Sequence, residues 1–153
     1  MTDRIFGALD RDATIQKAKE YLQDYHDWKI EAARFSLSLQ SPTISDMPGS
    51  PSHSNHQEDT VIGKANAQYE CEMRLKTIRL MGSIDDQNAM LADLLEYRFI
   101  DRWRVKKVCE RLADKYELGY LAERTYNDYQ NQALWTFALI SPQASLRITK
   151  VRR

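Results

Sequence analysis

A row of polar residues within 123–138, ERTYNDYQNQALWTFA, has side chains of the types that read DNA bases. In the major groove Arg pairs with guanine, Asn or Gln with adenine and Asp with cytosine, while Thr contacts a thymine methyl or a phosphate. The apolar residues Tyr126, Tyr129, Ala133 and Phe137 recur at helical spacing, so the polar row falls on the flanks and outer face of the same helix. The first two turns of such a helix normally enter the groove. We therefore expect base contacts from Arg124, Thr125, Asn127 and Asp128.

The distribution of charge along the chain also favours a polyanionic partner for the second half. The formal net charge of the 153 residues is zero, which at face value argues against a nucleic-acid protein. However, residues 1–95 hold 10 Lys and Arg against 15 Asp and Glu, whereas residues 96–153 hold 12 against 7. This asymmetry is expected if only the back half meets DNA, although chance clustering gives the same numbers. The residues that we expect at phosphates are Arg102, Arg104, Lys106, Lys107, Asn131, Arg147, Lys150, Arg152 and Arg153.

A polar outer face is also what any surface helix shows, so the elements before it matter. Apolar residues at helical spacing predict three helices, over residues 84–100, 104–116 and 122–139. The glycine-containing stretch ELGY supplies a turn between the last two, which gives the outline of a helix-turn-helix. We therefore expect a DNA-binding domain over residues 83–141, followed by a basic tail over residues 142–153.

The first half of the chain predicts a pair of long helices. One amphipathic helix is expected within residues 1–39, with an apolar stripe running from Ile15 to Leu39. Residues 40–59 hold three of the four prolines and five serines, and we expect a flexible linker there. A second helix over residues 60–82 carries a stripe that includes Ile62, Ala65 and Tyr69. The two helices predict an antiparallel hairpin or coiled-coil-like pair, formed within one chain or between two. The expected fold class is all-α.

Residues 97–138, YRFIDRWRVKKVCERLADKYELGYLAERTYNDYQNQALWTFA, resemble the C-terminal part of the ArpU-type phage transcriptional regulators. Those proteins carry a helix-turn-helix similar to region four of bacterial sigma factors. The residues that carry the resemblance are Tyr97, Arg98, Phe99 and Ile100, then Trp103, Val108 and Leu112, then Arg124, Thr125 and Tyr126, then Asn131, Gln132, Ala133 and Leu134, and finally Phe137 and Ala138. The Pro/Ser linker with ISDMP at 44–48 also resembles the layout of that family.

The resemblance implies a regulator of late or packaging genes in a temperate phage or prophage. The sequence departs from the family pattern at two points. Ala122 stands where the recognition helix is expected to have a Ser or Thr cap, and the turn DKYELGYL is several residues longer. Both departures leave the exact start of the recognition helix open.

Several conspicuous residues are expected to be structural. Cys71 and Cys109 have no zinc-ligand spacing and sit in apolar helical patterns, which predicts buried free thiols. Trp103 is expected to fill the gap between the first two helices of the DNA-binding domain. Trp135 is expected to be partly exposed. Asp85 and Asp86 are better explained as a helix start than as catalytic carboxylates.

No motif of an enzyme, a cofactor site or a metal site stands out. His53 and His56 share the linker with carboxylates, but two linker histidines without a nearby cysteine are more often solvated than metal-bound. The chain has no Ser-His-Asp order, phosphate-binding glycine loop or HExxH helix. We therefore expect no catalytic activity, no cofactor and no metal.

The remaining expectations concern location and partners. The N-terminus lacks the pattern of a signal peptide, and no stretch approaches the roughly eighteen apolar residues of a membrane span. We expect a protein of the bacterial host cytoplasm that binds double-stranded DNA, with host RNA polymerase as a possible protein partner and the N-terminal helices as a route to a homodimer. The alternative is a non-enzymatic phage interaction or packaging-associated assembly protein, whose C-terminal helices bind protein rather than DNA.

Overall fold

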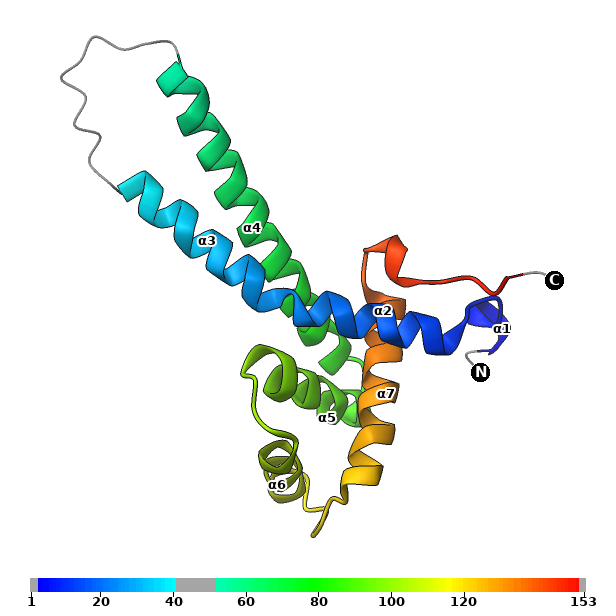
Figure 1. Cartoon of the computed structure of the whole chain (residues 1–153). Helices are drawn as coiled ribbons and strands as arrows, with labels where there is room; N and C mark the ends of the chain where they lie inside the picture. Colours follow the sequence, from blue (N-terminus) through cyan, green and yellow to red (C-terminus); the bar gives the residue numbers. More distant parts are fainter. Residues whose placement is uncertain (1–2, 41–51, 152–153) are drawn as a thin grey trace. The chain divides into compact units, whose positions relative to one another are not determined.

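A computed structural model describes residues 3–40 and 52–151, and these residues are predominantly helical (Figure 1). The all-α prediction is confirmed: the described residues contain no strand, only an isolated bridge between Leu9 and Thr149. The elements in order are α1 (Asp3–Phe6), α2 (Arg11–Gln23), α3 (Tyr25–Gln40), α4 (Ser52–Gly82), α5 (Asp86–Leu95), the π-helical turn η1 (Glu96–Ile100), α6 (Val105–Lys115), α7 (Glu123–Ile140) and the 3-10 turn η2 (Ala144–Leu146).

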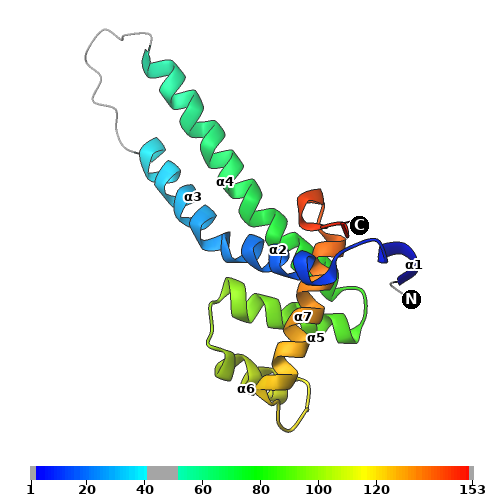
Figure 2. The same ribbon diagram turned by 45° about the vertical axis from the view of Figure 1, so that its right-hand side comes forward.

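The chain forms two compact units. The first, which we call the core unit, combines Met1–Gln23 with Arg74–Arg153, and the second, the hairpin unit, is Asp24–Met73. In the core unit α2 and α5 both pack along α7, and α6 also contacts α7 and α5 (Figure 2). The largest fully buried apolar side chains there are Leu22, Met81, Leu94, Leu95, Leu112, Tyr126, Leu134 and Phe137. Residues 11–23 therefore belong with the predicted DNA-binding domain, which corrects the expectation that they form part of a separate N-terminal helix.

The helix predicted to run without interruption to Leu39 is divided at Asp24, between α2 and α3. No Pro or Gly marks this break. Within the core unit the buried Arg74 donates from Nε to the carbonyl oxygen of Tyr21 at 2.8 Å, and its guanidinium carbon lies 3.7 Å from the centroid of the Tyr21 ring. Carbonyls in the last turn of a helix lack an intrahelical partner, and Arg74 supplies one. The end of α2 therefore depends on a residue 53 positions further along the chain.

In the hairpin unit α4 begins at Ser52, so residues 52–59 are helical rather than linker; residues 41–51 lie outside the described part. The face that α4 buries also differs from the prediction. Ile62 and Tyr69 are 66% and 56% exposed, whereas Ala67 and Cys71 are buried. The sequence-based choice of buried stripe was wrong, because α4 turns its small residues inward.

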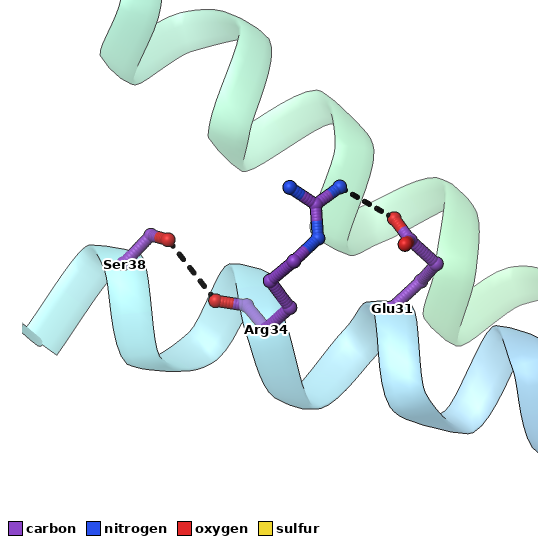
Figure 3. Close-up of polar contacts among 3 residues, drawn as sticks. All are labelled: Glu31, Arg34 and Ser38. Carbon is purple, nitrogen blue, oxygen red and sulfur yellow. Dashed lines mark hydrogen bonds and ion pairs between the residues drawn. The ribbon is translucent and has the colours of Figure 1, made fainter.

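Gly63 shows why the small residues of α4 face α3. A Cβ atom added at Gly63 would lie 2.6 Å from Cζ of Phe35 on α3, so any larger residue would force that ring to shift. The Arg34 guanidinium carbon lies 4.5 Å from the centroid of the same ring. Arg34 also pairs with Glu31 at 2.7 Å, and Ser38 donates to the Arg34 carbonyl at 3.1 Å (Figure 3). The ion pair with Glu31 and the Phe35 ring hold the Arg34 side chain along α3.

The predicted basic tail is attached to the core unit at several points, although most of its described residues are exposed. Leu146 is buried in the core, and the backbone N–H of Asp10 donates to the carbonyl of Ile148 at 2.7 Å. The N–H of Ile148 in turn donates to the buried Thr14 hydroxyl at 3.1 Å, and that of Lys150 donates to the Ala8 carbonyl at 2.9 Å. Residues 142–151 therefore belong to the same compact unit as α7, which ends at Ile140. Among the described helices, none combines the length and the apolar composition that a bilayer span needs.

Candidate nucleic-acid interface

The helix α7 turns its tyrosine stripe inward. Tyr126 is 1% exposed, Ala133 and Phe137 are fully buried, and Tyr129 is half-buried against the core. The side chains that we predicted at base edges all lie in solvent, as does the predicted phosphate ligand on the same helix: Arg124, Thr125, Asn127, Asp128 and Asn131. The solvent face of α7 is therefore polar over its first two turns. Contact of these side chains with bases stays a prediction.

The start of α7, which the sequence left open, lies at Glu123. Ala122 has extended backbone angles (φ −69°, ψ 149°), its carbonyl accepts from the N–H of Tyr126 at 2.9 Å, and its side chain provides no cap. Arg124 and Thr125 consequently occupy the first turn of the helix. The missing cap leaves the first N–H groups of α7 without the side-chain acceptor that Ser, Thr, Asp or Asn would supply.

The turn between α6 and α7 contains two left-handed residues. Glu117 has φ 53° and Gly119 has φ 75°. The N–H of Leu118 donates to the carbonyl of Ala113 at 2.9 Å, which is the hydrogen bond that closes a Schellman end of a helix. Leu121 is then buried in the core and fixes where α7 begins. The extra length of the turn is thus ordered structure, held by α6 at one end and by the core at the other.

Tyr126 anchors α7 to the core. Its hydroxyl donates to Oε1 of Gln130 at 2.7 Å, and burial raises the pKa of Tyr126 to about 12, an effect that nearby Arg98 partly offsets. Arg98 donates from Nη1 to the carbonyl of Trp103 at 3.0 Å. Arg98 therefore connects the buried face of α7 with the segment that precedes α6.

That segment holds two predicted phosphate ligands, Arg102 and Arg104, in exposed positions. Arg102 has φ 59°, a left-handed conformation that residues other than glycine adopt at a cost. The ring of Trp103 stacks on Tyr97 with centroids 4.7 Å apart and planes at 15°, and Lys107 Nζ lies 4.0 Å from the Trp103 centroid. Trp103 thus joins η1 to α6, in agreement with its predicted place.

The other predicted phosphate ligands fall into three groups. Lys106 and Lys107 on α6 and Lys150 near the chain end are exposed. Arg147 is half-buried, and its Nη1 donates to the carbonyls of Ala138 and Ser141 at 2.9 and 2.6 Å. It closes the C-terminal end of α7, where a cation also meets the negative end of the helix dipole, and we remove it from the phosphate set. Arg152 and Arg153 lie outside the described residues.

Three contacts that connect α5 with α6 and α7 were not predicted from the sequence. Lys115 pairs with Asp93 at 2.6 Å, and the Tyr116 hydroxyl donates to the same carboxylate, which joins α6 to α5. Hydrogen bonding to Asp93 raises the pKa of Lys115, and burial followed by that carboxylate raises the pKa of Tyr116. Gln87 donates to Gln132 at 3.4 Å between α5 and α7. These pairings are more than 20 residues apart in sequence, so no local pattern could have indicated them.

Two expectations about individual residues are settled by burial. Trp135 is 8% exposed with the Arg11 guanidinium 5.5 Å from its ring, so the prediction of partial exposure was wrong: α2 covers this side of α7. Cys71 and Cys109 are buried free thiols, as predicted.

The described residues contain no group of three or more His, Cys, Asp or Glu that could hold a metal ion. The side chains of His53 and His56 lie outside the described part.

The chain is similar to one curated protein over most of its length. It is 26% identical over 140 residues to the "Putative autolysin regulatory protein ArpU" of Enterococcus hirae, an alignment that spans 88% of this chain and 90% of that protein. No family model and no solved structure matches the chain. The alignment extends well beyond the C-terminal stretch that carries the resemblance in sequence.

Proposed function

We propose that the protein is a non-enzymatic transcriptional regulator that binds double-stranded DNA through α6, the turn and α7, used as a helix-turn-helix similar to region four of sigma factors. One observation carries the proposal: the first two turns of α7 present Arg124, Thr125 and Asn127 to solvent while Tyr126 is buried beneath them. A helix that inserts into the major groove needs this division between a packed face and a free polar face. The regulatory name of the Enterococcus hirae relative supports the same class.

In this proposal the two kinds of contact come from different elements. Arg124, Thr125, Asn127 and Asp128 contact bases, and Asn131 contacts a phosphate further along α7. Arg102, Arg104, Lys106, Lys107 and Lys150 supply the other phosphate contacts, with Arg152 and Arg153 included on the sequence alone. Phosphate contacts provide most of the affinity and set the register, whereas base contacts select the site.

The exposed apolar residues of the hairpin unit support self-association. Ile30 and Leu37 on α3 are 65% and 69% exposed, and Ile62 and Tyr69 on α4 stand out similarly. Exposed apolar side chains at helical spacing are typical of a surface that packs against another helix. We propose a homodimer through this unit, because two DNA-binding modules on one duplex raise affinity and lengthen the recognised sequence. The resemblance further suggests phage late or packaging genes as targets, host RNA polymerase as a partner and the bacterial cytoplasm as the location.

Arg124→Ala tests the proposed reading face. On a duplex selected from a random pool, we expect the substitution to cost about 1–3 kcal/mol and to relax preference at one base position, because a bidentate contact to guanine is lost. Fluorescence anisotropy across a salt series measures both effects. The matched control is Arg79→Ala, which removes an exposed arginine of α4 in the core unit and should leave binding unchanged. Equal affinity and unchanged base preference for Arg124→Ala would show that α7 does not read bases.

Lys106→Ala tests the phosphate contacts separately. We expect it to weaken binding to all duplexes alike and to reduce the slope of log K against log salt by about one, because one counterion fewer is released. The same salt series on selected and unrelated duplexes measures this. A change confined to the selected duplex would contradict the assignment of Lys106 to the backbone.

A second candidate function is an interaction or packaging-associated assembly protein whose C-terminal helices bind protein. The observation that favours it is the turn before α7, where Tyr120 is 82% exposed and Leu118 is 39% exposed. A DNA-binding surface gains little from exposed apolar side chains outside the groove-reading helix. Failure to bind any duplex at low salt would favour this function over the first.

A further inference from the structure

A groove of about 550 Å³ lies in the core unit between α6 and the turn that leads to α7. Its floor is apolar and consists of Cys109, Ala113 and Leu121, each with less than a tenth of its surface exposed. Tyr120 also lines the groove and is 82% exposed, so its ring is available to anything that enters. The groove thus offers an apolar contact surface with an exposed aromatic side chain at one edge.

The rim of this groove is acidic. Glu110 and Asp114 stand one helical turn apart on α6, Glu123 faces the groove from the first turn of α7, and Lys106 is the one cation among the lining residues. All four side chains are exposed. Burial raises the pKa of the Cys109 thiol on the floor, and the charges of Glu123 and Glu110 raise it further. The carboxylates therefore act on the interior of the groove, within a half of the chain that is basic in total.

This combination selects the chemistry of an occupant. The phosphates of a duplex would be repelled by three carboxylates, and the apolar floor would remain unused. A helix with one apolar stripe and lysines or arginines beside it would cover Leu121, Ala113 and Tyr120 while its cations meet the rim. We propose that this groove binds a cationic amphipathic helix of a partner protein. The inference does not depend on whether α7 reads DNA.

A model peptide tests the proposal on the full chain. The probe is a labelled peptide of about fourteen residues composed of leucine and lysine, with the leucines at helical spacing. We expect saturable binding by fluorescence anisotropy that weakens as salt rises, because the rim contributes through exposed charges. A version with glutamate in place of lysine should not bind.

Glu110→Gln combined with Asp114→Asn should weaken the peptide about tenfold at low salt, since two rim charges disappear while the shape of the groove is kept. The control combines Glu58→Gln with Asp59→Asn, two exposed carboxylates of α4 in the hairpin unit, and alters net charge equally. It should change affinity less than about twofold. Tyr120→Ser should weaken binding about fivefold. Because Tyr120 is highly exposed, the substitution should leave the fold intact, which circular dichroism checks.

Amide chemical-shift changes locate the bound peptide. The proposal requires that they centre on residues 105–123 and that the rim variant loses them. It is overturned if the rim and control variants weaken binding equally, if the shifts centre elsewhere, or if the peptide does not bind at low salt. DNA binding by the rim variant, measured in parallel, reports on the proposed regulator function separately, because none of the substituted residues belongs to the predicted DNA contacts.

Discussion

Tyr126 determines which way the predicted reading helix faces. It is almost completely buried, its hydroxyl is satisfied by Gln130 within the same helix, and its pKa is raised to about 12 by burial. Rotating α7 enough to bury Arg124 would bring this phenol into solvent and a guanidinium into the core. Burying an unpaired charge in this way is strongly unfavourable. One aromatic residue thus fixes the exposure of the polar row beside it.

Alkaline pH tests the burial of Tyr126. Because its folded-state pKa lies above the ordinary value of 10.0, its contribution to stability is complete below pH 10 and is lost as pH rises toward 12. We expect the free energy of unfolding to fall over this window, and to fall less steeply in Tyr126→Phe; Tyr116, whose pKa is also raised, accounts for part of the remainder. Urea titrations at several pH values measure the slope. Tyr120→Phe, which alters a highly exposed residue, should keep the parent profile.

At the scale of elements, the sequence predicted α6 and α7 almost to the residue, because each carries a single apolar stripe of helical period. The same reasoning failed for α4, which has apolar residues on two faces: the larger ones, Ile62 and Tyr69, were chosen, and the smaller ones around Gly63 and Ala67 are buried. Periodicity shows that a stripe exists, but which of two stripes is buried depends on packing partners such as Phe35, which approaches Gly63 closely.

The start of α7 offers a direct test of an element boundary. Ala122 has the extended backbone of an N-cap but no acceptor, so Ala122→Ser should stabilise the protein by about 1 kcal/mol by accepting a hydrogen bond from the first turn. Urea denaturation of the full chain measures the gain. Ala122→Val, which adds bulk without an acceptor, should give none. A serine that brings no stabilisation would indicate that α7 begins at another residue in solution.

At the scale of the whole molecule, the sequence predicted the helices of the first half but not the units that they join. The division at Asp24 depends on Arg74, and the packing of the chain end depends on Thr14, so both are tertiary effects without a local signature. The predicted base-contact side chains lie exposed on one face of α7, as their spacing indicates, and their contact with DNA stays a prediction. The role of Arg147 at the end of α7 has no local signature, because its carbonyl partners lie six and nine residues away.

Self-association through the hairpin unit can be tested with two substitutions on α4. Ile62→Asp combined with Tyr69→Asp should convert a dimer to a monomer, because two charges replace apolar side chains on the exposed face of α4. Light scattering measures the mass. Asn66→Asp combined with Gln68→Asp adds the same charges at exposed polar positions of that helix and should leave the mass unchanged. A monomeric parent protein would remove the hairpin unit from the proposed DNA-binding assembly.

The core unit is built from two stretches of chain with the hairpin unit inserted between them. During synthesis α2 emerges from the ribosome before α7. The contact between Tyr21 and Phe137, whose ring centroids lie 6.0 Å apart in the folded protein, therefore cannot form until later. Contacts so distant in sequence close slowly, and the apolar face of α2 is exposed meanwhile. The apolar face of α2 consequently stays uncovered until α7 has been synthesised and can pack against it, and chaperones are most needed during that interval.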